Sequence, residues 1–379
     1  MTTWAITPSS RQRVPVARRQ LLAEPAKLVV AVSAVGAAVA LVLLLSGLRR
    51  GIGEQVTVYL AHQPPVLVGQ SGARDFLSQT SVLPESVAAR VAAVPGVQDA
   101  APISEGYAML SLHGRRVLTL LIGYDQGRRG GPWQLQSGRE PRAFGEIVLD
   151  RVIAREHGFK VGSQISYGGR ALNVVGISAG TSGFMTPLEF TTRATANALT
   201  ERPKTATFLL VTPQHGVDIT ALERRIAAAV PGVSAVSRDT LKSRDRALVV
   251  GAFSGPLLAM VAIAAVVAVM VIALTVYTSV RDRSREYATL KTVGLDRRGL
   301  MRLAAVQACV LALAGSALGV LLALAATRGV AEWAPKYLIA VTPADTFAMA
   351  AAAVAFALFA AFVPARYLAQ LDPAEAFRR

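Results

Sequence analysis

Four long stretches of the chain contain no Asp, Glu, Lys, Arg or His. They are residues 28–48, 247–280, 303–327 and 346–365. A helix of about 20 apolar residues, rising about 1.5 Å per residue, crosses a hydrocarbon core of about 30 Å, so each stretch is long enough to span a membrane. The alternative is four buried helices of a large soluble protein, but such helices rarely run this long without a charge. The pattern predicts four transmembrane helices, one before and three after a large polar segment.

The composition also favours a membrane protein. Hydrophobic residues make up 53% of the 379 residues, charged residues make up 17%, and the mean hydropathy is +0.43. Ordinary soluble domains are about 45–50% apolar and about 25% charged. These values exclude a disordered chain, a collagen and a disulfide scaffold, and they disfavour a fully soluble enzyme. The one cysteine, Cys309, lies in the third apolar stretch, so the polar segment folds without a disulfide.

Two of the apolar stretches have unusual ends. Residues 247–280 would be about 51 Å long as one helix, so this helix either tilts or extends outside the membrane as a stalk. Gly255-Pro256, near its start, predicts a break or a kink. The first stretch follows a basic leader, residues 1–27, and no clear cleavage box follows it, so we expect a retained signal anchor.

The distribution of Lys and Arg predicts the orientation in the membrane. Five lie in the leader, seven in residues 281–302 and three in the tail, residues 366–379, whereas residues 328–345 contain two. Both termini and residues 281–302 should therefore be cytoplasmic. Residues 49–246 and the short 328–345 loop should lie outside. We expect a multi-pass protein of the plasma (inner) membrane.

The outer segment, residues 49–246, alternates helix and strand patterns and predicts a mixed α/β domain. Separate strands are expected at residues 97–103 and 107–112. Thr220-Ala221-Leu222-Glu223 has the pattern of a capping box, which predicts the start of a helix.

The outer segment also contains a weak internal repeat. A helix pattern, a Pro-Gly stop and a strand pattern occur in the same order at residues 88–97 and 223–233. The repeat predicts paired βαβ units within one domain, and two unrelated helix ends are the alternative. The residues between, about 127–200, would then form an inserted subdomain.

No catalytic, cofactor-binding or metal site is predicted. The sequence has neither the G-x-x-x-x-G-K-S/T phosphate loop nor the G-x-S-x-G nucleophile motif. Four dispersed histidines lack the spacing of metal ligands: His62, His113, His157 and His215. Ion-coupled transporters and intramembrane proteases place ionisable or polar catalytic groups at mid-membrane, and the uncharged stretches argue against both classes.

The net charge of +16 does not indicate a nucleic-acid partner. No basic patch is interleaved with aromatic residues, and the basic residues lie on both sides of the predicted membrane. The cytoplasmic ones suit anionic lipid head groups. The outer segment has 23 basic and 16 acidic residues, a net charge of +7 that the topology does not explain.

One motif within the third apolar stretch predicts close helix packing. Gly315-Ser316-Ala317-Leu318-Gly319 is a G-x-x-x-G motif, in which Gly315 and Gly319 would permit two helix backbones to approach.

The cytoplasmic residues 281–302 predict a short charged helix with one apolar side. Gly294 is placed to end this helix. The helix either contacts a partner or lies on the bilayer surface. Its apolar residues are Tyr287, Leu290, Val293 and Leu295.

These segments resemble a known family. Arg285-Glu-Tyr-Ala-Thr-Leu-Lys-Thr-Val-Gly-Leu295, followed by Arg297-Arg298 and an apolar span, is similar to the signature of FtsX/MacB-type permeases of ABC transporters. The end of the chain, Val363-Pro-Ala-Arg366 and then Leu371-Asp-Pro-Ala-Glu-Ala-Phe377, resembles their C-terminal motif. Looser matches to their outer domain are Val94-Pro-Gly-Val97, Ile122-Gly-Tyr-Asp125, Ser137-Gly-Arg139 and Phe159-Lys-Val-Gly162.

The resemblance implies a permease that is not itself an enzyme. Two copies of a separate ATPase, which bind ATP and Mg, would each dock on one permease, and the permease would form a homodimer or pair with a similar subunit. ATP-driven motion would then move the outer domain and export or extract an amphiphilic substrate. The alternative is an FtsX-like transmitter that activates a cell-envelope hydrolase. The expected ATPase-coupling residues are Arg285, Glu286, Tyr287, Thr289, Leu290, Lys291, Val293, Gly294 and Leu295.

Overall fold

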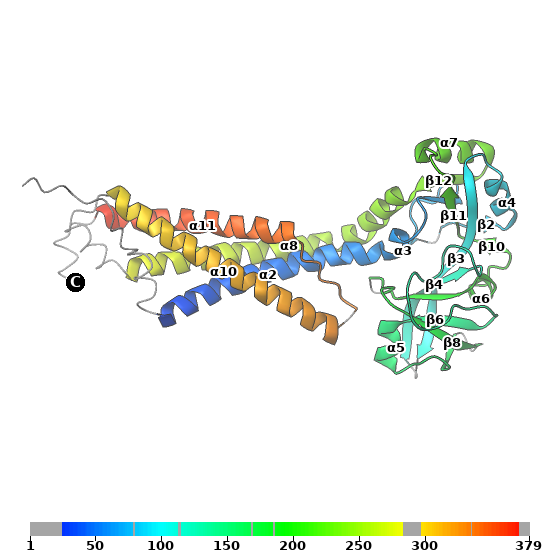
Figure 1. The fold of residues 1–379 in the computed structure, drawn as a ribbon, viewed down its shortest axis with the longest axis horizontal. Coiled ribbons are helices and arrows are strands. Elements are labelled where there is room, and N and C mark those ends of the chain that lie inside the picture. Colours follow the sequence, from blue (N-terminus) through cyan, green and yellow to red (C-terminus); the bar gives the residue numbers. More distant parts are fainter. Residues whose placement is uncertain are drawn as a thin grey trace, which may run out of the picture. The chain divides into compact units, whose positions relative to one another are not determined.

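The computed structural model in Figure 1 describes residues 25–282 and 297–370, apart from 79, 113–114, 168–169, 185 and 335. These residues form two compact units. The helical unit consists of the described residues of Met1–Leu48, Pro256–Val330 and Ile339–Arg379. The α/β unit consists of those of Arg49–Gly255 and Ala331–Leu338.

Four long helices supply the helical unit: α2 (Pro25–Val56), α8 (Arg238–Asp282), α10 (Arg297–Trp333) and α11 (Pro343–Gln370). Each contains a segment that is long and apolar enough to cross a membrane, which confirms the four predicted spans. The candidate spans are Pro25–Val56, Gly255–Thr278, Met301–Trp333 and Pro343–Phe362.

More than half of the buried residues in the main core of the helical unit are alanines, alongside larger ones such as Leu43 and Ile272, and many of its large apolar side chains are exposed. Its core includes Ala308, Ala312 and Ala357, whereas Met270 and Phe359 are exposed. Small residues allow helix backbones to approach closely where lipid, rather than water, surrounds the helices. This arrangement is the one expected of an integral membrane protein.

The second apolar stretch forms part of a single helix. The helix α8 runs from Arg238 to Asp282 with Pro256 inside it, so the break expected at Gly255-Pro256 is not present. Proline removes one backbone hydrogen bond, here the bond to the carbonyl of Ala252, and apolar helices tolerate such a loss.

The α/β unit is built around a ten-stranded sheet with the order β12-β1-β11-β3-β4-β9-β6-β8-β5, in which β7 also pairs with β3 and β8. A second, two-stranded sheet pairs β10 with β2. The elements are α3 (Val58–Ala61), β1 (Val66–Gln70), β2 (Leu83–Pro84), α4 (Ser86–Ala92), β3 (Val97–Leu112), β4 (Arg115–Tyr124), β5 (Leu135–Gly138), β6 (Glu146–Asp150), α5 (Arg151–His157), β7 (Gln164–Tyr167), β8 (Arg170–Ser178), β9 (Leu188–Thr192), α6 (Arg193–Leu199), β10 (Thr205–Ala206), β11 (Phe208–Pro213), α7 (Ile219–Ala229) and β12 (Val233–Ser237).

The predicted pair of βαβ units is confirmed. β1 and β3 are each antiparallel to β11, which lies between them, so β1-α4-β3 is a parallel crossover. β11-α7-β12 is a second crossover, with β1 between its strands. The two helices pack in one apolar cluster that includes Val91 of α4 and Ile226 of α7. Each Pro-Gly stop uses a glycine with positive φ, +98° at Gly96 and +85° at Gly232, which ends the helix before the strand.

The other half of the sheet has its own apolar cluster. This cluster includes Leu110 of β3, Leu121 of β4, Ile153 of α5 and Phe159. The expected insertion at about 127–200 contains β5 to β9, α5 and α6. The core of these elements also includes residues of β3 and β4, which precede residue 127. The two halves therefore share long strands (Figure 1).

Two local expectations for the α/β unit are wrong. The two strands expected at 97–103 and 107–112 are one strand, β3, because its pairing with β4 continues without a shift from Ile103 to Leu112. The helix α7 starts before the expected capping box. Its N-cap is Asp218, two residues before Thr220. The Asp218 Oδ1 accepts a hydrogen bond from the Ala221 backbone N at 2.9 Å and so caps a free N–H group of the first turn.

Candidate functional site

The residues predicted to couple to an ATPase lie outside the described residues. The predicted set extends from Arg285 to Leu295, between the end of α8 at Asp282 and the start of α10 at Arg297. The C-terminal motif at 371–377 also lies outside them. The coupling role of these residues therefore stays a prediction from the sequence.

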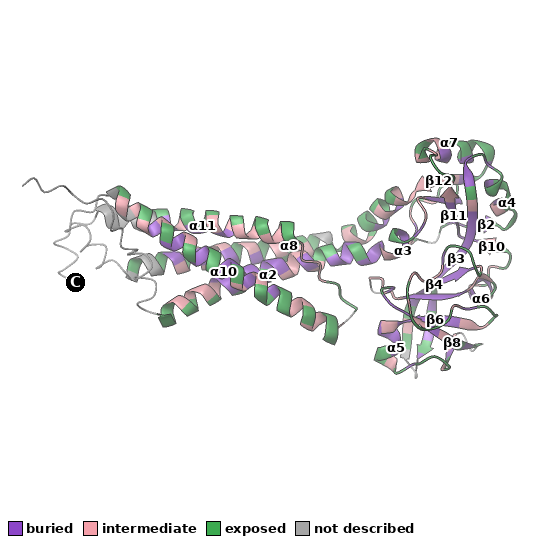
Figure 2. Ribbon diagram, in the orientation of Figure 1, coloured by how far each residue is buried: buried purple, intermediate pink, exposed green. Residues whose placement is uncertain are grey.

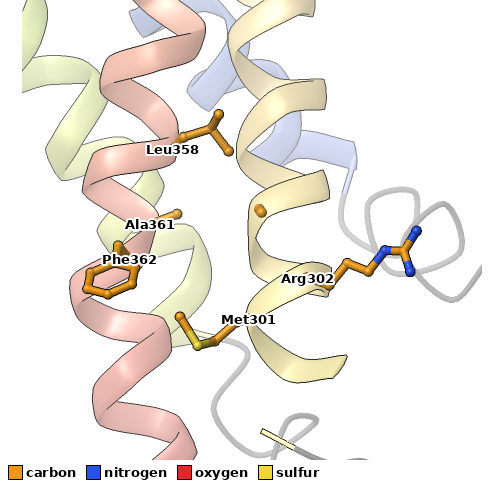
Figure 3. A pocket seen from close by; sticks show the side chains of 6 residues that line it. Met301, Arg302, Leu358, Ala361 and Phe362 are labelled. Carbon is orange, nitrogen blue, oxygen red and sulfur yellow. The ribbon is translucent and has the colours of Figure 1, made fainter. Parts of the chain in front are cut away.

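A cavity of about 350 Å³ lies between the first turns of α10 and the later part of α11. Figure 3 shows Met301, Leu358, Ala361 and Phe362 around this space, with Arg302 directed away from α11. Ala305 completes the lining. The cavity begins five residues after Asp296, so in sequence it adjoins the predicted coupling segment.

Gly315 and Gly319 lie where α10 crosses α2. A Cβ atom on Gly315 would lie 2.5 Å from Val35 Cγ1, and one on Gly319 would lie 2.7 Å from the backbone O of Gly36. Gly36 lies in the same crossing but is less confined, because its own Cβ would lie 3.2 Å from the Gly315 backbone O. Gly36 is not part of a motif in the sequence. A glycine inside the first apolar stretch was the only available signal.

In the α/β unit, the N-terminal part of α8 is tied to other elements by polar side chains. The Oδ1 atom of Asp245 accepts hydrogen bonds from the backbone N atoms of Phe76 at 2.9 Å and Leu77 at 3.3 Å. Arg246 Nε donates to the Gly53 backbone O at 3.3 Å. These contacts fix the first turns of α8 against the loop after β1 and the C-terminal part of α2.

Gln55 makes a similar connection from the end of α2 to the segment between α10 and α11. Its Nε2 donates to the Lys336 backbone O at 2.9 Å, and its Oε1 accepts from the Leu338 backbone N at 3.3 Å. Gln55 is buried. Its partners are about 280 residues away in the sequence, so no local pattern could indicate this contact.

Two acidic side chains are buried together in the α/β unit. Neither carboxyl oxygen of Glu105 has a hydrogen-bond partner among the described residues, and Oδ2 of Asp245 also lacks one. Burial raises the pKa of Glu105 well above its usual range, the nearby Asp245 and Asp75 raise it further, and Arg202 lowers it. Burial likewise raises the pKa of Asp245 to about 7, and the hydrogen bonds from Leu77 and Phe76 oppose this rise.

The described residues contain no group of three or more His, Cys, Asp or Glu side chains placed to hold a metal ion. His62 lies with its Nδ1 2.9 Å from the Val58 backbone O and its ring stacked on Trp133 at 3.9 Å. His157 lies near the ring of Phe159. Both histidines therefore make packing contacts with aromatic rings.

Two protein-family models match the chain. The MacB-like periplasmic core domain matches residues 28–229, more than half of the chain, and the FtsX-like permease C-terminal domain matches residues 258–373. The first model covers the first span and most of the α/β unit, and the second covers the last three predicted spans.

Relatives match over almost the full length. The chain is 27% identical over 360 residues to the uncharacterized ABC transporter permease Rv0072 of Mycobacterium tuberculosis (strain ATCC 25618 / H37Rv), which covers 93% of this chain and 95% of the relative. It is 26% identical over 365 residues to the uncharacterized ABC transporter permease Mb2592 of Mycobacterium bovis, with the same coverage.

Solved structures of outer regions are also similar to part of the chain. The periplasmic region of MacB from Actinobacillus actinomycetemcomitans matches with a TM-score of 0.38 and 15% identity, over 51% of this chain and 94% of that chain. The extracellular domain of the noncanonic ABC-type transporter YknZ from Gram-positive bacteria matches with a TM-score of 0.36 and 11% identity, over 45% of this chain and 98% of that chain.

The two family models together account for the four apolar helices and for the mixed α/β unit between the first and second of them. Because the MacB-like model alone covers more than half of the sequence, the chain belongs to the FtsX/MacB-type permeases of ABC transporters.

Proposed function

We propose that this permease transmits the ATP-driven motion of a separate ATPase to its α/β unit and thereby exports or extracts an amphiphilic substrate. An ABC transporter permease implies a partner ATPase subunit. In the proposed complex, two ATPase copies bind ATP and Mg²⁺, and each docks on one of two permease copies through residues 285–295. We expect the two permeases to be identical.

The observation that carries this proposal is the continuity of α2 and α8. The helical structure of α2 passes without interruption from Leu48 to Arg49, and that of α8 passes from Gly255 to Pro256, which are the points where the chain leaves one unit for the other. A continuous helix has no loop to absorb a displacement, so it is suited to carry motion along its axis.

The side-chain ties described above support the same proposal. Asp245 on α8 bonds to the loop after β1, Gln55 on α2 bonds to the segment between α10 and α11, and Arg246 joins α8 to α2 itself. A displacement of either helix would therefore act directly on loops of that unit.

The proposed topology follows from the positive-inside rule. Residues 281–302 carry seven Lys and Arg, whereas residues 328–345 carry two. Both termini and residues 281–302 would then face the cytoplasm, where an ATPase is present, and the α/β unit would lie outside the plasma membrane.

The proposal is tested by changing the expected docking helix. The permease is co-expressed with its candidate ATPase, encoded by a neighbouring gene, and co-purification and ATPase activity are measured for Tyr287→Asp and Leu290→Asp. Both changes place a charge on the apolar side of the predicted helix, so we expect loss of ATPase binding or of stimulated hydrolysis. Phe144→Asp is the matched control, because Phe144 is 61% exposed in the loop between β5 and β6.

Unchanged binding and hydrolysis in both docking variants would contradict the proposed coupling. Cross-linking of the full chain in membranes then addresses the cargo. Capture of a cell-envelope hydrolase in place of an amphiphile would favour the FtsX-like alternative.

A further inference from the structure

One face of β3 changes from covered to open at Glu105. Along this face Ile103 and Glu105 are buried, whereas Tyr107 is 40% exposed and Met109 is 47% exposed. Leu118 of β4, the Cα partner of Met109, is 42% exposed. Tyr107, Met109 and Leu118 therefore form an apolar strip. The strip lies on the same face of the sheet as a buried core, but its side chains are partly exposed.

The residue at the covered end of the apolar strip is a carboxylic acid without a partner. Glu105 is 1% exposed, and neither of its carboxyl oxygens has a hydrogen-bond partner among the described residues. Its backbone is satisfied, because its N donates to Thr207 Oγ1 at 2.9 Å. Buried polar atoms are nearly always hydrogen-bonded in native proteins, so two unpartnered oxygens on one side chain require an explanation.

The side chains around Glu105 add negative rather than positive charge. Asp245 of α8 and Asp75 of the loop after β1 both act on it as like charges. Arg202, after α6, is the cation that acts in the opposite direction. Tyr59 of α3 and Tyr107 of β3 are the other titratable groups that interact with Glu105. This local excess of acid lies in an outer segment whose net charge is +7.

We propose that the apolar strip and Glu105 form a binding site for a cationic amphiphile, whose apolar body lies on Tyr107, Met109 and Leu118 and whose ammonium group pairs with the Glu105 carboxylate. This inference rests on the proposed function and names the class of its substrate. Charge complementarity selects this occupant, because a cation is what the unpartnered oxygens of Glu105 and Asp245 lack. The Tyr107 ring offers the ammonium a second favourable contact through its π face.

The oxygens of Glu105 are covered, so the site requires one side-chain movement. Tyr107 is the next residue on the same face of β3 and is only partly buried. The proposed site therefore includes a change of the Tyr107 χ1 rotamer that opens Glu105 to a ligand lying on the apolar strip. Rotamer changes of partly exposed side chains are fast, so this step does not limit binding.

Binding of a cation at this site has a proton signature. Burial and the two neighbouring acids raise the pKa of Glu105 well above its usual range, so this carboxyl group keeps its proton to a higher pH than an exposed glutamate does. An ammonium group stabilises the carboxylate and lowers that pKa, so the proton leaves when the ligand binds. The affinity for the cation should therefore rise as the pH rises, and a neutral ligand should show no such dependence.

The test uses the full chain in nanodiscs of zwitterionic lipid and two probes that differ in charge. These are dansylcadaverine, a cationic amphiphile, and its N-acetyl derivative, which is neutral and is larger by one acetyl group. Fluorescence titration measures both dissociation constants, and calorimetry in buffers of different ionisation enthalpy measures proton release. We expect the cationic probe to bind at least about 10-fold more tightly, which corresponds to about 1.4 kcal/mol, with release of a proton.

Three variants separate the parts of the site. Glu105→Gln should remove both the preference for the cation and the proton release while leaving the neutral probe unaffected. The double variant Met109→Ser, Leu118→Ser should weaken both probes. Glu189→Gln is the matched control, because Glu189 is also fully buried and has one unpartnered oxygen among the described residues. Glu189 lies elsewhere in the sheet, since its strand partner Leu121 belongs to the core cluster that contains Leu110 and Phe159. Thermal unfolding of each variant reports whether it is folded.

Equal affinities of the wild-type protein for the two probes, or an equal loss of preference in Glu189→Gln, would overturn the site. Efficient disulfide cross-linking of Met109→Cys between two permease copies would also overturn it, because the apolar strip would then be covered by a second copy. These results are separable from the proposed function. If Tyr287→Asp loses ATPase coupling but the wild-type protein shows no preference for the cationic probe, the proposed coupling is retained and this site is rejected.

Discussion

The two units of this permease use apolar residues in opposite ways. The α/β unit buries its largest apolar side chains, such as Phe76, Phe190 and Phe208. The helical unit buries alanines and leaves large side chains such as Phe359 exposed, and Figure 2 shows exposed residues along much of its helices. Water drives large side chains into a core, whereas lipid gives them no reason to leave the surface. The difference shows which unit is stabilised by the hydrophobic effect and which by the fit between helices.

The largest expected effect comes from making the same substitution in both units. Phe208→Ala removes a buried ring that contacts Phe76 at a centroid distance of 5.2 Å, and we expect a loss of about 3–5 kcal/mol in the stability of the α/β unit. Phe359→Ala, at a side chain that is 77% exposed, should change stability by less than about 0.5 kcal/mol. Limited proteolysis and thermal unfolding in nanodiscs measure both. Equal losses would mean that the helical unit also depends on burial of large side chains.

A smaller effect is expected where the helical unit depends on close fit. Gly319→Leu would force α10 away from Val39 and Gly36 of α2, at a cost of about 1–3 kcal/mol. Gly329→Leu is the control on the same helix, because a Cβ atom there meets nothing within 4 Å. Unfolding by SDS, followed by circular dichroism, compares the two. If both variants unfold alike, the crossing of α2 and α10 is not what stabilises this unit.

The smallest expected effect is a dependence on pH in the α/β unit, which contains the buried acid Asp245. The pKa of Asp245 rises from 3.8 to about 7, so the folded protein keeps a proton that the unfolded chain loses. The Asp245 contribution to stability is therefore full below about pH 4 and is lost as the pH rises to about 7. The stability of the wild type relative to Asp245→Asn should therefore fall over this range.

Glu146 provides the opposite case for that experiment. The hydrogen bond from Arg139, at 2.5 Å, lowers the pKa of Glu146 to about 2. Its contribution is present above its unfolded pKa and is lost as the pH falls towards 2, so the loss of stability in Glu146→Gln should be constant above the unfolded value of 4.5 and should shrink below it. A change of the same sign in both variants between pH 4 and pH 7 would contradict the buried position of Asp245.

Features set by local pattern could be predicted from the sequence. The four spans follow from uncharged runs of sufficient length, and the paired βαβ units follow from two Pro-Gly stops after amphipathic helices. The prediction was wrong where a neighbouring element decides the outcome. β3 is one strand because β4 pairs with it throughout, and α8 continues through Pro256 because a helix tolerates the loss of one hydrogen bond.

The candidate sites divide in the same way. The sequence alone singled out residues 285–295 by an apolar side on a charged segment, and singled out Gly315 and Gly319 by their spacing. It could not identify Gly36, Gln55 or Glu105, because their importance depends on partners that are distant in the chain or missing from the fold.

The sequence by itself determined that the chain enters a membrane four times and carries a mixed α/β unit, because hydrophobic length and helix–strand periodicity are properties of consecutive residues. Only the tertiary structure decided which glycine α10 packs against and which acid is left without a partner. Those outcomes depend on how helices cross and on the register in which strands pair, and both are set by packing between residues far apart in the chain.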